Sequence, residues 1–195
     1  MIPPHHPVVE RAARGEIPGW AQATAARVAH MGRVAALLEE WATGLGLPEA
    51  ERCRWLAAAH LHDALRNADP EELRAGVQPE CALLPGPLLH GPAAAQRLWV
   101  DGVRDGELLN AVAFHTLGHP ALRVMGRALY AADFLEPGRD LLNEWRAELR
   151  GRMPGELDEV VRQVLGARIG HLVELRAPLR PETVAFWNAL MGDDR

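Results

Sequence analysis

The sequence contains no lysine, only two cysteines, and no apolar run approaching the about 18 residues of a membrane-spanning helix. Its 21 basic residues are therefore all arginines, which codon usage in a GC-rich genome explains more simply than function does. Cys53 and Cys81 stand alone without CxxC spacing, which argues against a thiolate zinc site and indicates reduced cysteines in a cytoplasmic protein. With a formal net charge of −5, the chain lacks the excess of positive charge that is typical of nucleic-acid-binding proteins. We expect neither a nucleic-acid nor a membrane partner.

Residues that favour β-strands are also scarce, and no strand-like alternation of useful length occurs. Ala, Leu, Glu and Arg dominate, as helices prefer, so the sequence predicts an all-α fold. The chain is most simply one helical domain, over residues 19–192, after an N-terminal extension of residues 1–18. Apolar spacing and Pro/Gly breaks predict a loop over 76–87, a helix start at Asp69-Pro70, and helices over about 20–41, 48–64, 88–99, 105–115, 122–135, 138–152, 157–175 and 181–187.

Histidines and aspartates recur along the chain, one or two in each predicted helix, as side chains of facing helices do when they converge on a metal. Nitrogen and oxygen ligands without thiolates favour iron, with manganese or cobalt as alternatives, and one or two ions. A carboxylate can bridge two ions, which an imidazole cannot, so Asp63 is the natural bridge. Such a centre activates water and cleaves phosphoesters or phosphoanhydrides. The candidate metal ligands are His30, His62, Asp63, His90, His115 and Asp133.

A single histidine on a helix is more often structural than ligating. His60 lies two residues before His62 and would point roughly 200° away from it on a helix, so we interpret it as structural. We interpret His119 and His171 in the same way.

The surroundings of the candidate ligands resemble one family. They are Arg-Val-Ala-His30, Ala-Ala-His-Leu-His-Asp63-Ala-Leu-Arg, Leu-Leu-His90-Gly-Pro, Phe-His115-Thr-Leu-Gly and the stretch from Arg127 through Asp133 to Glu-Pro-Gly-Arg139. On these motifs, residues 27–188 resemble the YqeK family of the HD phosphohydrolase superfamily. The resemblance implies an HD-domain helical bundle with a metal site between its helices.

The resemblance also implies a symmetrical dinucleoside tetraphosphatase, in which metal-activated water cleaves diadenosine tetraphosphate at its centre into two ADP. The metal would be iron, and the enzyme a homodimer. His30, His62, Asp63 and Asp133 would hold the first ion. His90 and His115, with Asp63, would serve a second ion or the phosphate chain.

Catalytic roles fall on Asp63 and Arg66 in this resemblance. Arg66 and Arg127 stand where the family has lysine, which keeps the charge but changes its geometry. Either arginine could instead pair with a carboxylate that orients the metal ligands. The residues expected to bind the nucleotide substrate are Arg27, Gly91, Thr116, Arg127, Arg139 and Arg180, the last of which stands at a histidine position of the family.

Two other functions stay open at this point. The chain could be an HD phosphohydrolase that acts on a mononucleotide, a guanosine polyphosphate or another small phosphoester. It could also be a non-catalytic nucleotide-binding or adaptor domain that keeps its metal for structure. The two enzyme hypotheses differ in the substrate that is hydrolysed. Replacing Asp63 would distinguish both of them from the adaptor, because an enzyme should lose metal and turnover together.

Overall fold

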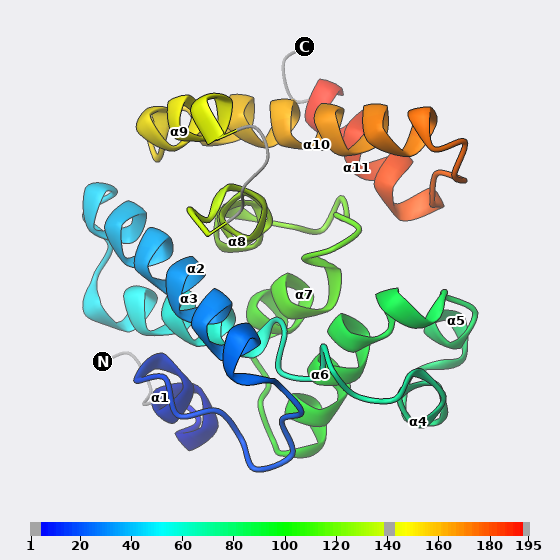
Figure 1. The fold of residues 1–195 in the computed structure, drawn as a ribbon. Coiled ribbons are helices and arrows are strands. Elements are labelled where there is room, and N and C mark those ends of the chain that lie inside the picture. The colour runs from blue at the N-terminus through cyan, green and yellow to red at the C-terminus, as the bar shows by residue number, and fades with distance from the viewer. Residues whose placement is uncertain (1–4, 139–142, 193–195) are drawn as a thin grey trace.

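The computed structural model describes residues 5–138 and 143–192, and within these ranges it contains α-helices, one short 3₁₀ helix and no strand (Figure 1). The prediction of an all-α fold is therefore confirmed. No helix of the described ranges has both the length and the apolar character that crossing a membrane requires. The elements are α1 (Pro7–Ala13), α2 (Ala25–Gly44), α3 (Glu49–Leu61), α4 (Pro70–Ala75), α5 (Pro79–Ala82), η1 (Gly86–Leu88), α6 (His90–Val100), α7 (Gly106–Phe114), α8 (Val124–Leu135), α9 (Asn143–Arg152), α10 (Leu157–Glu174) and α11 (Pro181–Gly192).

One long helix begins later than predicted because of local capping. The helix predicted from residue 20 begins only at Ala25, where the Thr24 side chain accepts a hydrogen bond from the Arg27 N–H and so caps α2. At α4 the prediction is confirmed, since the carboxylate of Asp69 accepts hydrogen bonds from the first-turn N–H groups. The predicted helix over 138–152 is seen as α9 from Asn143, and residues 139–142 lie outside the described ranges.

Three short elements were not predicted. α1 buries Val8, Val9 and Ala12 within the hydrophobic core, packed on α3. α5 and η1 occupy the segment predicted as loop, and in both a proline stands near the first helical position, where its missing N–H costs no hydrogen bond. Helices this short lack the apolar periodicity by which the longer ones are recognised.

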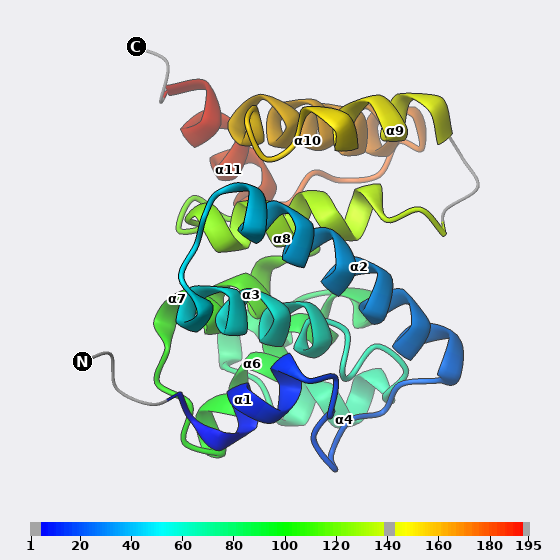
Figure 2. The same ribbon diagram turned by 90° about the vertical axis from the view of Figure 1, so that its left-hand side faces the viewer.

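α8 lies in the middle of the molecule and is buried over most of its length. Both views show α8 with α9, α10 and α11 on one side and with α2, α3 and α7 on the other (Figures 1 and 2). The ring of Tyr130 on α8 packs edge-on against the ring of Phe186 on α11, and both residues are fully buried. Side chains on opposite faces of α8 can therefore contact the helices on either side of it.

Close approach of α6 and α7 sets the spacing of two candidate ligands. A Cβ on Gly91 would lie 2.7 Å from the carbonyl oxygen of Ala113 and 2.9 Å from that of Val112, so no side chain fits there. His90 is the first residue of α6 and His115 caps the C-terminal end of α7. The glycine contact thus brings these two imidazoles together.

Candidate metal centre

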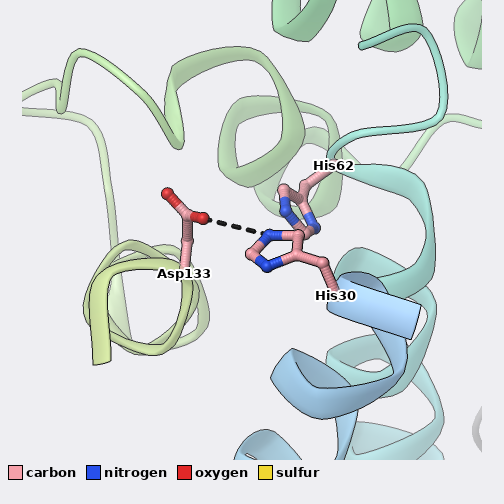
Figure 3. Close-up of side chains that lie close together, drawn as sticks. All are labelled: His30, His62 and Asp133. Atoms are coloured by element: carbon pink, nitrogen blue, oxygen red, sulfur yellow. Dashed lines mark ion pairs between the residues drawn. The ribbon is translucent and has the colours of Figure 1, made fainter. Parts of the chain in front are cut away.

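The structure brings all six predicted ligands into one buried cluster. His30 lies within α2, Asp133 lies on α8, and the others stand at or just beyond helix ends, where the backbone turns toward the centre. All six residues are 8% exposed or less, and charged groups buried to this degree need partners. Figure 3 shows His30, His62 and Asp133 facing one another.

Asp63 stands at the middle of the cluster, with its two oxygens turned to different neighbours. Oδ2 lies 3.6 Å from His30 Nε2 and 3.5 Å from His62 Nε2. Oδ1 lies 3.1 Å from His90 Nε2 and 3.4 Å from His115 Nε2. Asp63 therefore divides the cluster into two halves that share its carboxylate, which is the arrangement expected of a bridge between two ions.

The four imidazoles present the same atom to the cluster. The Nδ1 atoms of His62, His90 and His115 lie 2.8–2.9 Å from the carbonyl oxygens of residues 59, 87 and 112. Because a carbonyl only accepts, each Nδ1 must carry the proton, which leaves the Nε2 lone pair directed inward. His30 places its Nδ1 3.2 Å from the carboxylate of Glu136. Such outer hydrogen bonds orient metal-ligating histidines.

Burial and charge set the protonation of the cluster. Burial lowers the pKa of His62 to about 4 and also lowers the pKa of His90, so both are neutral ligands at neutral pH. Burial alone would raise the pKa of Asp63, but its histidine neighbours, led by His62, outweigh that effect and hold the pKa below its usual range. For His30, burial alone would lower the pKa, but the carboxylates of Asp133, Glu136 and Asp63 together outweigh it and raise the pKa. The Asp63 carboxylate therefore stays ionised and attracts positive charge.

Glu136 and Arg33 extend the cluster behind His30. The Arg33 Nε atom donates to Glu136 Oε2 at 2.5 Å, and the backbone N–H of Gly138 donates to the same oxygen at 2.7 Å. Burial opposes ionisation of Glu136, yet these hydrogen bonds and His30 lower its pKa to about 2. An ionised Glu136 fixes the ring orientation of His30 and makes it a stronger donor to a metal.

The donor set fits a divalent metal ion. The Nε2 atoms of His30 and His62 are buried and form no hydrogen bond of suitable geometry within the described residues, although carboxylate oxygens of Asp133 and Asp63 lie 3.2 and 3.5 Å from them. Two unprotonated Nε2 atoms, those of His90 and His115, face each other at 3.1 Å, which is unfavourable without a cation or proton beside them. Ligand atoms of His30, His62 and Asp133, and those of His62, Asp63 and His115, each lie within 4.8 Å of one another. These groups could hold one or two ions.

A pocket of about 640 Å³ opens over the cluster. Asp63, His90, His115 and Asp133 form part of its wall, so a bound molecule would reach the candidate ligands directly. Cationic side chains line the same wall, although the whole chain is acidic. The lining arginines are Arg27, Arg66, Arg168 and Arg180.

Several predicted substrate residues lie in this pocket. Arg27 lines it and donates to Asp63 Oδ2 at 2.7 Å, while Thr116 places its hydroxyl 3.0 Å from His115 Nε2. Arg66 and Arg180 are half-buried there, and neither forms an ion pair with any residue that the structure describes. The alternative in which Arg66 pairs with an orienting carboxylate is therefore not seen.

Two predicted substrate residues lie elsewhere. Arg127 donates to the carboxylate of Asp158 at 2.8 Å and to the carbonyl of Leu122, outside the pocket wall, so its position does not support the predicted phosphate contact. Gly91 is buried against α7, where its lack of a side chain allows the two helices to approach closely. Arg139 falls outside the described residues.

Two polar residues of the site, Arg168 and Glu136, do not follow from the sequence motifs, and a third, His171, lies in a place that the sequence did not predict. Arg168 on α10 lines the pocket and donates to Asp133 Oδ2 at 3.0 Å, and Glu136 supports His30. The position of Glu136 three residues after Asp133 could have indicated it, but nothing local marks Arg168 among so many arginines. His171, interpreted as structural, lies exposed on the pocket wall.

Comparison with known proteins identifies relatives. The HD domain family matches residues 27–164, which span the ligands from His30 to Asp133. A protein of Halalkalibacterium halodurans named symmetrical bis(5'-nucleosyl)-tetraphosphatase is 27% identical over 144 residues, 71% of this chain and 76% of that protein. A Bacillus subtilis protein of the same name is 27% identical over 143 residues, 69% of this chain and 75% of that protein.

A solved structure shares the fold. It comes from Clostridium acetobutylicum and is described as a predicted HD superfamily hydrolase involved in NAD metabolism. It superposes with a TM-score of 0.73 at 24% identity and covers 85% of this chain and 88% of its own. The prediction of an HD-type helical bundle is thereby confirmed.

Proposed function

Because this chain belongs to the HD domain family, we propose that it is a metal-dependent hydrolase that cleaves diadenosine tetraphosphate symmetrically into two ADP. The observation that carries the proposal is an arginine-lined pocket whose wall includes four of the six candidate ligands. The choice of substrate follows from the names of two relatives, both called symmetrical bis(5'-nucleosyl)-tetraphosphatase. A polyphosphate is the kind of ligand that needs local positive charge on an otherwise acidic protein.

His30, His62, Asp63 and Asp133 would hold one ion, and His90 and His115 with Asp63 would hold a second, with iron as the proposed metal. When bound, such ions lower the pKa of water and stabilise charge on phosphoryl oxygens. Asp63 serves both halves because its two oxygens face different pairs of histidines.

The side chains around the ions bind and orient the phosphate chain. Arg66 and Arg180 have no carboxylate partner within the described residues, so each can offer its planar fork to phosphate oxygens in a bidentate contact. Arg27 keeps its contact with Asp63 and maintains the charge of that carboxylate. The hydroxyl of Thr116 can donate a further hydrogen bond at the edge of the cluster.

Product analysis tests the proposal. The protein is purified anaerobically, loaded with Fe²⁺, given diadenosine tetraphosphate, and the nucleotides are separated by ion exchange. We expect ADP as the only product. ATP together with AMP would contradict central cleavage while leaving a hydrolase, and absence of turnover with Fe²⁺, Mn²⁺ and Co²⁺ would contradict the assigned activity.

Variants connect turnover to the pocket. Replacing Arg66 or Arg180 with methionine should lower kcat/KM by about 10–100-fold, since each removes a hydrogen bond to a charged group. Arg97→Met is the matched control, because Arg97 is exposed on α6 and lies outside the pocket. Asp63→Ala should abolish metal binding and turnover together. An adaptor domain would instead keep binding its nucleotide after this change.

A further inference from the structure

One arginine of α10 contacts both halves of the ligand cluster. The Nη2 atom of Arg168 donates to Asp133 Oδ2 at 3.0 Å, and its Nη1 atom donates to the backbone oxygen of Thr116 at 2.9 Å. Asp133 belongs to the half that includes His30. Thr116 follows His115 directly and belongs to the other half.

The contact with Asp133 determines which oxygen faces the cluster. Asp133 Oδ1 lies 3.2 Å from His30 Nε2, while Oδ2 is bound by Arg168. The carboxylate is thereby held in one rotation, with Oδ1 turned toward His30 and the half of the cluster to which His30 belongs. Without the guanidinium, the carboxylate would be able to rotate about its last torsion, which has a broad energy profile.

The guanidinium itself is held in place. It lies 4.6 Å from the centre of the Tyr130 ring and 5.4 Å from that of Phe134, both on α8. Its side chain is 21% exposed. Cation–π contacts and a planar fork restrict an arginine more than a lysine, so the group can act as a rigid spacer.

We propose that Arg168 is a positioning residue of the metal centre, which makes Asp133 a one-oxygen ligand and sets the spacing between the two halves of the cluster. It acts through Asp133 and through the segment that carries His115, without touching the ion. The inference rests on the metal centre of the proposed function and is independent of which nucleotide is cleaved.

The test compares metal affinity with the stability of the metal-free protein. In Arg168→Gln we expect the affinity for Mn²⁺, measured by calorimetric titration of the full chain, to fall by about 10–100-fold, as for other outer-shell changes. The Tm of the metal-free protein, measured in the presence of a chelator, should change little in this variant. Raising Mn²⁺ should restore much of the kcat of this variant.

Arg162→Gln is the matched control on the same helix. Arg162 also donates to a carboxylate, that of Glu159 at 3.0 Å, and to a backbone oxygen, that of Leu190 at 3.3 Å. Its side chain is 19% exposed, close to that of Arg168, and it lies outside the pocket wall. We expect Mn²⁺ affinity within about twofold of the unchanged protein, since no ligand depends on it.

Four results would overturn the inference. Arg168→Gln could bind Mn²⁺ as tightly as the unchanged protein, or both variants could lose affinity equally, which would indicate a general structural effect. If Arg168→Gln does not fold, Arg168→Lys replaces it, and an unchanged Mn²⁺ affinity in that variant is the contrary outcome. If the unchanged protein itself binds no Mn²⁺, Fe²⁺ or Co²⁺, the proposed metal centre fails, and this inference fails with it.

Discussion

Replacing Gly91 with alanine should separate α6 from α7 and disturb one half of the metal centre. The new Cβ would lie 2.7 Å from the carbonyl oxygen of Ala113, and that contact must lengthen to 3.4 Å, by about 0.7 Å, to become ordinary. Both opposing atoms are backbone, so no side chain can rotate away. His90 is the neighbouring residue and would move with the helix, whereas metal ligands tolerate displacements of only about 0.2 Å.

The magnitude follows from two opposing effects. Overpacking of this kind costs about 1–3 kcal/mol, and the helix propensity of alanine returns at most about 1 kcal/mol. A net loss of about 1–2 kcal/mol lowers the Tm of a chain of this size by roughly 2–8 °C. Displacement of His90 should weaken Mn²⁺ binding by about tenfold or more, by analogy with outer-shell changes.

Differential scanning calorimetry and Mn²⁺ titration measure the two effects. Gly170→Ala is the matched control, because Gly170 lies within α10 and a Cβ there would have no other atom within 4 Å. That change should raise the Tm by about 1–4 °C, from a gain of about 0.5–1 kcal/mol. The reasoning would be refuted if Gly91→Ala matched this control in Tm and retained full Mn²⁺ affinity.

Three further predictions concern charge and metal. Burial alone would raise the pKa of Asp105, but Arg54, which binds it through two nitrogens at 2.6 and 2.8 Å, lowers the pKa below its usual value. This charge therefore stabilises the fold above about pH 4 and ceases to do so as pH falls through the lowered pKa. Asp105→Asn should cost about 1 kcal/mol at pH 7, and urea unfolding should show that cost shrinking as the pH is lowered below about 4. Glu136→Gln should weaken Mn²⁺ binding by about 10–100-fold by loosening His30, and an unchanged titration would exclude that role. Metal at 100 times its Kd should stabilise the protein by about 2.7 kcal/mol, so chelation should lower the Tm by roughly 5–11 °C, whereas an unchanged Tm would contradict a folded-state metal site.

Helix ends were less predictable than helix interiors. The long helices α2, α3, α8 and α10 follow from apolar spacing and from proline and glycine breaks, which are properties of neighbouring residues. α1 has only seven residues, so its periodicity is too brief to recognise, yet tertiary packing on α3 stabilises it. Val28 stands at helical spacing from the buried Met31 and Val34 of α2 yet is 39% exposed, so apolar spacing alone does not mark where the buried face of a helix ends.

The arginines show most clearly what the sequence left open. Arg127 and Arg168 carry the same charge on adjacent packed helices, and nothing within either segment distinguishes a pocket residue from a surface pair. The packing of α10 on α8 determines which arginine lies in the pocket, because it places Arg168 against Asp133 and Arg127 against Asp158.

Whether a side chain can bind a metal depends on its own chemistry, so the sequence alone determined the six candidate ligands. Whether a segment is helical depends mainly on neighbouring residues, so the sequence alone also determined the all-α fold. Which side chains support those ligands depends on contacts between segments far apart in the chain. Glu136 reaches His30 from more than a hundred positions away, and Asp63 faces two pairs of histidines only after four helices have packed. Such contacts depend on the full three-dimensional packing of the core, which only the tertiary structure specifies.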